Sequence, residues 1–366
     1  MNRIERRKFL KQTACGTLAA MAMQSLGPQH AAAAGATGRI KIGQIGVGHA
    51  HASGKMDALR RHADHFEVVG VVEPDAQRRA MCEKLPAYRG LTWMTEQQLL
   101  ATQGLQAVAV ETTVADLVPT AQRCIEAGMH LHLDKPAGES LQAFRKLLDA
   151  ATRRGLTVQM GYMFRNNPAF QFCFRAVREG WLGQITEVHG VISSLYNAEQ
   201  RKPLAPYRGG IMFELGGHLI DPLVTVLGKP ERVTPYIRRL RPQWDDVADN
   251  QLAVFEYAKA MATVRSSLLE VSSGQRRQFV VCGDEGTVDI RPLEPPRLQL
   301  ALSRPRDAYH RGYQEITLPA MPGRYDDQLL ELAAIIRGEK PNAYSPAHDL
   351  AVEETLLQAA GLPIAS

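Results

Sequence analysis

A glycine-rich turn near the start of the chain has the residue types that bind a dinucleotide. Residues 46–51 read GVGHAH between a short apolar segment and a helical pattern. The first glycine permits the tight bend, and the second lets the backbone approach a pyrophosphate at the helix N-terminus. The third fingerprint position holds His51 instead of glycine. A strand–turn–helix without a ligand is the alternative.

Glu73 adds weight to the dinucleotide prediction. It ends the second predicted strand, within the expected strand–helix–strand unit. A carboxylate at this place binds the ribose 2′-hydroxyl of NAD and repels the 2′-phosphate of NADP. The pattern therefore favours NAD as the cofactor, while the neighbouring Arg78 and Arg79 keep NADP open.

Lys135 is the first candidate for a catalytic side chain. It stands in Asp134-Lys135-Pro136, directly after an apolar strand. Ligands of parallel sheets bind outside the carboxyl ends of the strands, and an ammonium there can hydrogen-bond a substrate oxygen. A surface lysine on a proline turn is the alternative.

A histidine with nearby carboxylates is the second candidate. The segment ELGGHLID places Glu214 four residues before His218, so on a helix the two share one face, with Asp221 a turn further on. A histidine paired with a carboxylate moves protons near neutral pH. Two points stay open: the glycine pair between them disfavours a continuous helix, and Asp221 before Pro222 fits a helix cap equally well.

These residues need a scaffold, and the first part of the chain predicts a doubly wound parallel sheet. Short apolar runs alternate with helical patterns over residues 38–160. The expected strands are 39–46, 67–72, 107–110, 130–133 and 157–160, with helices at 75–85, 118–127 and 141–154.

Beyond a helix at 168–179 the chain becomes strand-rich, which indicates an open, mostly antiparallel sheet. Two helical segments, 325–337 and 350–360, are expected to pack back on the body. The expected strands are 185–192, 231–237, 251–257, 261–269, 277–281, 287–290 and 298–302.

The first residues indicate an export signal. Arg6-Arg7 begin a twin-arginine pattern, residues 13–26 are mildly apolar, and 31–36 offer small residues for cleavage. The apolar run is too short for a membrane span, which needs about 20 residues. The predicted domains are a signal at 1–36, a nucleotide-binding domain at 37–160 and a second α/β domain at 161–366, in a periplasmic protein.

Composition narrows the class of protein. The 366 residues are 45% hydrophobic, enough for two domains. A formal net charge of +5, with acids and bases interspersed, does not indicate nucleic acid. None of the five cysteines stands in a C-x-x-C pair, so neither zinc nor a redox dithiol is signalled. A protein that folds in the cytoplasm before export is expected to need no disulfide.

Together the motifs resemble the glucose–fructose oxidoreductase, inositol dehydrogenase and MocA (Gfo/Idh/MocA) family along essentially the whole mature length. Family members have a glycine-rich turn, an E-K-P motif and a D-x-x-x-H motif followed by an acid. Segments 161–168 and 180–183 also resemble the domain junction of that family. This chain departs from the pattern at His51, Asp134 and Glu214. The matching motifs are Gly46-x-Gly48, Asp134-Lys135-Pro136 and Glu214-x-x-x-His218 with Asp221.

The resemblance implies a Rossmann domain followed by an α/β domain whose open sheet serves substrate binding and oligomer contacts. It also implies hydride transfer between a nicotinamide and a hydroxyl of a sugar, glycoside or polyol. In that reaction His218 removes the hydroxyl proton, Glu214 orients or relays for it, and Lys135 steadies the alkoxide. Export further suggests that the cofactor is tightly bound and recycled internally.

The sequence thus defines a candidate site, with no metal predicted. The expected partners are a carbohydrate substrate and further copies of the chain, without nucleic acid and without a membrane after processing. The cofactor-binding candidates are Gly46, Val47, Gly48, His49, His51, Glu73, Thr112 and Lys135. The substrate-side candidates are Tyr162, Arg165, Asn166, Tyr196 and Asp221.

Three other functions stay open. One is a dehydrogenase that releases its reduced cofactor. Another is a glycoside-cleaving enzyme in which transient oxidation permits elimination. The third is a sugar-binding accessory protein that keeps the fold without turnover, against which the intact Lys135 and His218 argue.

Overall fold

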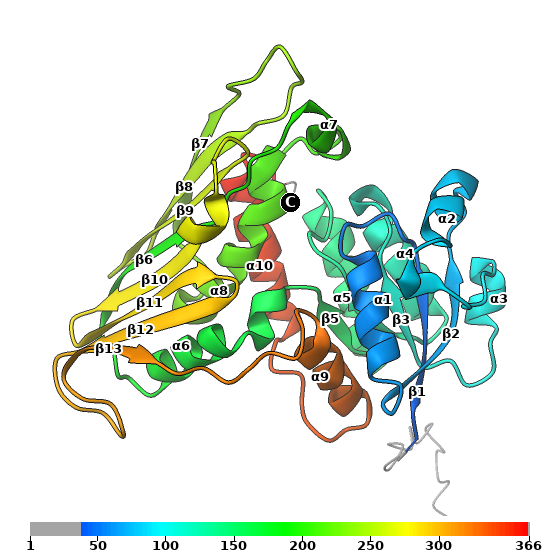
Figure 1. Cartoon of the computed structure of the whole chain (residues 1–366), viewed down its shortest axis with the longest axis horizontal. Coiled ribbons are helices and arrows are strands. Elements are labelled where there is room, and N and C mark those ends of the chain that lie inside the picture. Colours follow the sequence, from blue (N-terminus) through cyan, green and yellow to red (C-terminus); the bar gives the residue numbers. More distant parts are fainter. Residues whose placement is uncertain (1–37, 365–366) are drawn as a thin grey trace, which may run out of the picture. The chain divides into compact units, whose positions relative to one another are not determined.

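The computed structural model describes residues 38–364, so the predicted export signal lies outside the described residues. The first sheet has the strand order β2-β1-β3-β4-β5, with all neighbours parallel and helices between successive strands (Figure 1). Its strands are β1 (Ile40–Ile45), β2 (Phe66–Val72), β3 (Ala107–Val110), β4 (His130–Leu133) and β5 (Val158–Met160). Its helices are α1 (Ala52–Arg61), α2 (Ala76–Cys82), α3 (Glu96–Leu100), α4 (Val114–Glu126) and α5 (Leu141–Arg153).

This arrangement confirms the predicted doubly wound sheet. All four residues of β3 are fully buried, as expected for a parallel strand that is covered on both faces. The strand order reverses between β1 and β3, because β1 pairs with both β2 and β3. The carboxyl ends of the strands at such a reversal open a crevice in which ligands bind.

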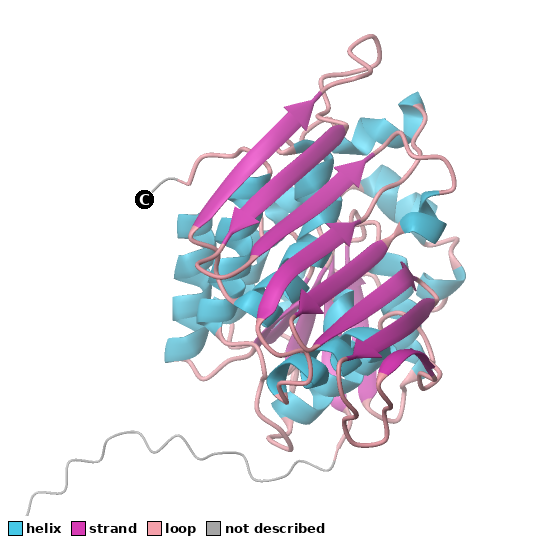
Figure 2. Ribbon diagram, turned by 90° about the vertical axis from the view of Figure 1, so that its left-hand side faces the viewer, coloured by secondary structure: helices cyan, strands magenta, loops and turns pink. Residues whose placement is uncertain are grey.

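The second sheet has eight strands in the order β13-β12-β11-β10-β6-β9-β8-β7, all antiparallel except the pair β6–β9. Alternate residues of β8 are buried, because one face of the sheet packs on helices while the other is open (Figure 2). This confirms the predicted open, mostly antiparallel sheet. The strands are β6 (Ile185–Val191), β7 (Arg232–Arg238), β8 (Asn250–Glu256), β9 (Met261–Ser267), β10 (Gln278–Gly283), β11 (Gly286–Leu293), β12 (Pro296–Leu302) and β13 (Gly312–Ile316).

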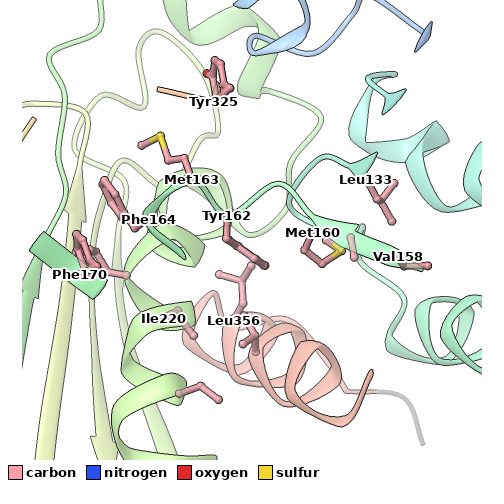
Figure 3. Packing of buried hydrophobic residues seen from close by; sticks show 14 of the residues in the cluster. Leu133, Val158, Met160, Tyr162, Met163, Phe164, Phe170, Ile220, Tyr325 and Leu356 are labelled. Atoms are coloured by element: carbon pink, nitrogen blue, oxygen red, sulfur yellow. The ribbon is translucent and has the colours of Figure 1, made fainter. Parts of the chain in front are cut away.

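Helices from the second half of the chain join the two sheets. Helix α10 contacts α5 of the first sheet and α8 of the second, and α9 contacts α1. Figure 3 shows Tyr162 pointing toward Leu356 of α10, close to Met160 at the end of β5. One continuous apolar core therefore supports both sheets. The helices are α6 (Pro168–Arg178), α7 (Ala198–Arg201), α8 (Gly217–Leu227), α9 (Asp326–Ile336) and α10 (Pro346–Ala359).

Two further findings bear on the expectations from composition. Cys82, Cys124, Cys173 and Cys282 are free thiols, while Cys15 lies outside the described residues. Among the helices of residues 38–364, none combines the length and the apolar character that a membrane crossing requires.

Glu353 on α10 has a buried carboxyl group with few hydrogen-bond partners. Its Oε2 accepts one hydrogen bond from the backbone N–H of Ala137 at 3.3 Å, and its Oε1 has no partner within residues 38–364. Burial raises the pKa of Glu353 to about 8, with a smaller opposing effect of the Ala137 bond. The carboxyl is therefore protonated in the folded protein at neutral pH.

We expect Glu353→Gln to stabilise the protein at pH 8 but hardly at pH 4. Between the ordinary pKa of 4.5 and the folded pKa of about 8, the unfolded chain loses a proton that the folded chain keeps. Stability contributed by this group is thus complete at low pH and lost as the pH rises. The gain at pH 8 should be on the order of 4 kcal/mol in denaturant unfolding. Glu354→Gln, beside it but paired with Lys229, is the control, and a gain that does not vary with pH would contradict the assignment.

Candidate active site

The glycine turn after β1 has the geometry that a dinucleotide needs. Gly46 has φ +89°, and a Cβ there would lie 2.6 Å from the backbone N and Cα of Thr112. Only glycine fits such a position without a shift. Helix α1 starts at Ala52, directly after the turn, so its free backbone N–H groups lie where a pyrophosphate rests.

A cavity of about 540 Å³ adjoins this turn. Glu73 and Thr112, both predicted from the sequence, line it together with Arg78. The carboxylate of Glu73 is held in place by the backbone N–H groups of Val47, at 3.0 Å, and Asp75, at 2.9 Å. The turn, the helix start and this anchored carboxylate together fit the pyrophosphate and ribose of a dinucleotide.

We expect the protein to bind NAD more tightly than NADP by roughly tenfold or more. A 2′-phosphate would meet the buried carboxylate of Glu73, and like charges at a close contact cost more than about 1.4 kcal/mol. Glu73→Ala should narrow the difference, because Arg78, 3.3 Å from that carboxylate, then faces the phosphate alone. Titration calorimetry with NAD and with NADP measures the difference in affinity, and the variant Glu83→Ala, at an exposed glutamate, is the control. Equal affinities of the unaltered protein for NAD and NADP would show that Glu73 does not select between the two cofactors.

Asp134 at the end of β4 is the centre of a buried charge cluster. His49 Nδ1 and Lys55 Nζ each lie 2.9 Å from its Oδ2, and His51 Nδ1 lies 3.2 Å from the same oxygen. Lys55 also contacts Glu111 at 3.0 Å. Burial alone would raise the pKa of Asp134, but His49, Lys55 and His51 hold it well below the usual range. The carboxylate is therefore ionised and orients the groups around it.

The pair of imidazoles with Asp134 has the spacing of a metal site. The same oxygen, however, already faces the fully buried ammonium of Lys55 at 2.9 Å. A divalent cation there would place a second cation against one buried carboxylate oxygen, and the repulsion between the two cations disfavours this. The donor set fits a cluster of ion pairs around Asp134 and not a metal.

Lys135 and Glu214 form a direct pair in the crevice. Lys135 Nζ donates to the carbonyl of Glu214 at 2.8 Å and to its carboxylate Oε1 at 3.2 Å. The side chain of Lys135 is 1% exposed. His49 of the glycine turn contacts the Lys135 carbonyl through Nε2 at 3.0 Å, which links the predicted cofactor turn to this lysine.

His218 lies beside this pair without a carboxylate partner. Its ring is 5.9 Å from the ring of His51 and 5.8 Å from that of Phe164, centroid to centroid. Its Nδ1 is buried and makes no hydrogen bond within the described residues. Burial, followed by the charge of Lys135, lowers the pKa of His218 well below its ordinary value. His218 is therefore a neutral imidazole, able to accept a proton.

The partnership of Glu214 differs from the expectation. On an α-helix Glu214 and His218 would share one face, but Met212–Gly216 is a π-helix that passes into α8 at Gly217. The wider turn changes the angular spacing of the side chains. In the described structure Glu214 pairs with Lys135, and no hydrogen bond joins it to His218.

Two of the expected substrate contacts are instead part of a buried ion network. Arg165 donates to Asp221 and to Asp349, each at 2.6 Å, and its side chain is 2% exposed. Asp221 also contacts His348 at 3.3 Å. Their charged groups are occupied by one another, so Arg165 and Asp221 hold α8 and α10 together.

The other three expected contacts lie in different surroundings. The hydroxyl of Tyr162 is buried without a partner in the described structure, and its ring meets His218 edge-on at 6.5 Å. Asn166 donates to Glu331 at 3.0 Å. Tyr196 is partly buried against an apolar cluster that includes Leu204. Of these, Tyr162 is the one placed beside the candidate histidine.

Two residues of the site were missed by the sequence analysis. Lys55 has a sequence signal, since it falls on the buried side of the helix after the turn, four residues beyond His51. Tyr325 has none, because it belongs to an irregular segment before α9. Its ring lies 5.8 Å from the ring of His51 and 5.8 Å from Lys55 Nζ.

Two protein-family models match this chain. Residues 40–162 match the model of an oxidoreductase family with an NAD-binding Rossmann fold, and residues 170–289 match the Gfo/Idh/MocA C-terminal domain. The first match contains the glycine turn and Lys135, and the second contains Glu214 and His218. The protein is thus a nucleotide-binding oxidoreductase by class. It belongs to the Gfo/Idh/MocA family, as its sequence motifs had suggested.

Individual relatives are distant. The uncharacterized oxidoreductase YhhX of Escherichia coli is 28% identical over 56% of this chain and 59% of the relative. The scyllo-inositol 2-dehydrogenase (NADP(+)) IolW of Bacillus subtilis is 25% identical over 45% of this chain and 49% of the relative. The chain thus spans less than two thirds of the length of either. In fold it is similar to UDP-N-acetylglucosamine 3-dehydrogenase GnnA of Acidithiobacillus ferrooxidans, with TM-score 0.72, 20% identity and coverage of 88% and 97% of the two chains.

Proposed function

We propose that this protein is an exported NAD(P)-dependent oxidoreductase that acts on a hydroxyl of a sugar, glycoside or polyol by hydride transfer. The observation that carries the proposal is the meeting of Lys135, Glu214 and His218 beside the dinucleotide turn, with His49 bonded to the Lys135 carbonyl at 3.0 Å. A titratable cluster at the carboxyl ends of parallel strands is where such chemistry takes place.

The residues divide the work on the hydroxyl. Two of the three ammonium hydrogens of Lys135 are taken up by Glu214, which leaves one to donate to a substrate oxygen and stabilise its developing negative charge. His218 is neutral and takes the hydroxyl proton. The nicotinamide supplies the hydride acceptor when the cofactor is bound.

The chemical class of the substrate rests on the relatives. One is named for the oxidation of an inositol and another for that of a nucleotide-linked amino sugar. Both names describe a ring that carries secondary hydroxyls. A crevice with one free ammonium donor and one neutral imidazole suits such a group, because it needs a donor at the oxygen and an acceptor for its proton.

Two further parts of the proposal concern location and assembly. The twin arginines at positions 6 and 7, outside the described residues, support export to the periplasm. Large side chains on the second sheet support a homo-oligomer, since Tyr236 is 52%, Met261 66% and Tyr313 71% exposed. Exposed apolar surface of this kind is typical of protein interfaces.

A substrate panel tests the reaction. The protein is incubated with NAD and free sugars, polyols or glycosides, and the products are identified by mass spectrometry. A product lacking two hydrogen atoms, or a transient one of that kind before cleavage of a glycoside, supports hydride transfer. Saturable sugar binding without any product, even with bound NAD, would overturn the proposal in favour of an accessory protein.

A further inference from the structure

His51 occupies the fingerprint position where glycine normally allows close packing of helix and strand. Its side chain lies between the carboxyl end of β4 and helix α8. It lies among His49 of the turn, Lys55 of α1, Asp134 and Lys135 after β4, His218 of α8, and Tyr325 before α9. The side chain is 14% exposed, so solvent reaches it.

Asp134 orients this imidazole. His51 Nδ1 lies 3.3 Å from Asp134 Oδ1, in hydrogen-bond geometry, and 3.2 Å from Oδ2. Because the carboxylate can only accept, Nδ1 carries the hydrogen and Nε2 keeps its lone pair. Nε2 makes no hydrogen bond within residues 38–364. A carboxylate on one ring nitrogen and a free lone pair on the other is the arrangement of an acid–base histidine.

His218 lacks that support. No carboxylate contacts its ring in the described structure, and Glu214 is engaged by Lys135. A proton on His218 would be destabilised by burial and by the charge of Lys135. Burial also disfavours a proton on His51, but the ionised Asp134, 3.2 Å from its Nδ1, opposes that effect. Transfer of a proton from His218 toward His51 therefore moves it closer to a compensating charge.

We propose that His51, held by Asp134, is a second acid–base group that carries the hydroxyl proton from His218 out of the crevice. The inference rests on the proposed function, which supplies the proton. Oxidation of the carbinol releases one hydride and one proton. In the proposed reaction the bound nicotinamide would accept the hydride. The proton passes from the hydroxyl to His218, then to His51 Nε2, and then to solvent. A ring separation of 5.9 Å suits transfer through one water.

A purely structural role for His51 makes a different prediction. If His51 only filled space, returning the position to glycine would restore the usual fingerprint without loss of turnover. Burial lowers the pKa of His51 to about 4, and the charge of Asp134 only partly opposes this shift, so the ring is neutral at pH 7. A neutral ring at pH 7 is able to accept a proton, which a space-filling role does not require.

The test compares His51→Gly and His51→Gln with the unaltered full-length enzyme on the substrate found by the panel. We expect kcat to fall about 100-fold in both variants, the lower end for a positioned acid–base group. The NAD dissociation constant should stay within about threefold, since the glycine restores the ordinary fingerprint. Added imidazole should restore turnover in His51→Gly, which leaves room for it, and not in His51→Gln.

His62 offers a matched control. It is also a carboxylate-bound histidine, 2.8 Å from Asp326 and 18% exposed, but it lies at the end of α1 away from the crevice. His62→Gln should keep full turnover. Nitrogen-15 NMR of the protein as purified gives a readout independent of activity: His51 should be neutral with its hydrogen on Nδ1 at pH 7.

The outcomes separate the two proposals. Full turnover in His51→Gly, or a hydrogen on Nε2 of His51, overturns the relay and leaves the proposed function intact. A reduced kcat of the His51 variants, with full NAD binding and with rescue of His51→Gly by imidazole, supports the relay. An unaltered enzyme that binds NAD but converts no sugar, polyol or glycoside overturns the proposed function and the relay with it.

Discussion

Alanine at Lys135 or at His218 is expected to lower turnover by at least about 100-fold while NAD binding survives. The figure is the usual effect of a positioned acid–base or charge-stabilising group. Lys135 provides the single ammonium hydrogen left over from the Glu214 pair, and His218 is the neutral imidazole beside it. Neither side chain lines the cavity beside the glycine turn. Steady-state kinetics on the panel substrate, together with calorimetry for NAD, measure both effects.

The two variants need different controls. Lys135→Ala leaves the carboxylate of Glu214, whose side chain is 15% exposed, without its cation. A melting curve must therefore show that the variant is folded. The double variant Lys135→Ala/Glu214→Gln removes the unpaired negative charge as a second control. Lys146→Ala, an exposed lysine on α5, controls for loss of positive charge. Near-full activity of His218→Ala on the true substrate would show that another group takes the proton.

The protein is also expected to keep its cofactor through extensive dialysis and to turn over without added NAD. Under the proposed export, the enzyme works outside the compartment that holds the soluble nicotinamide pool, so released NADH could not readily be replaced. Retention requires nanomolar binding, which corresponds to roughly 12 kcal/mol. The turn, the start of α1 and the cavity that holds Glu73 supply contacts for the pyrophosphate and the ribose of the dinucleotide.

Two measurements decide this expectation. The dialysed protein is denatured and its released nicotinamide is quantified, and turnover is followed without supplement. A cofactor-free protein that consumes added NAD in proportion to product would refute internal recycling and favour a plain dehydrogenase. Export is tested by cell fractionation, because replacing Arg6 and Arg7 by lysine should leave the protein in the cytoplasm.

Much of the fold could be predicted from local patterns. The strand at 107–110 is a continuous apolar run, and it is fully buried in the structure. Strand β13 (Gly312–Ile316) was missed because it is an edge strand whose residues are mostly exposed, so its sequence has no apolar alternation. The short α3 was missed as well, although Thr95 and Gln98 form a capping box at its start.

The candidate site was predictable residue by residue, but its pairings were not. The glycine turn, Glu73, Lys135 and His218 stand out because each has a motif or a place at a strand end. The partner of Glu214 was not predictable, since it depends on the π-helix at Met212–Gly216. The roles of Arg165 and Asp221 depend on Asp349, which lies more than a hundred residues further along the chain.

The sequence by itself thus determined the family, the two kinds of sheet and the residues able to bind a dinucleotide and move a proton. These features follow from hydrophobic periodicity and from motifs shorter than about ten residues, which depend on local geometry. Only the tertiary structure decided which charges meet: Lys55 with Asp134, Lys135 with Glu214, and His51 beside His218. These contacts join segments that are distant in sequence, and the packing of β4, α1 and α8 brings them together.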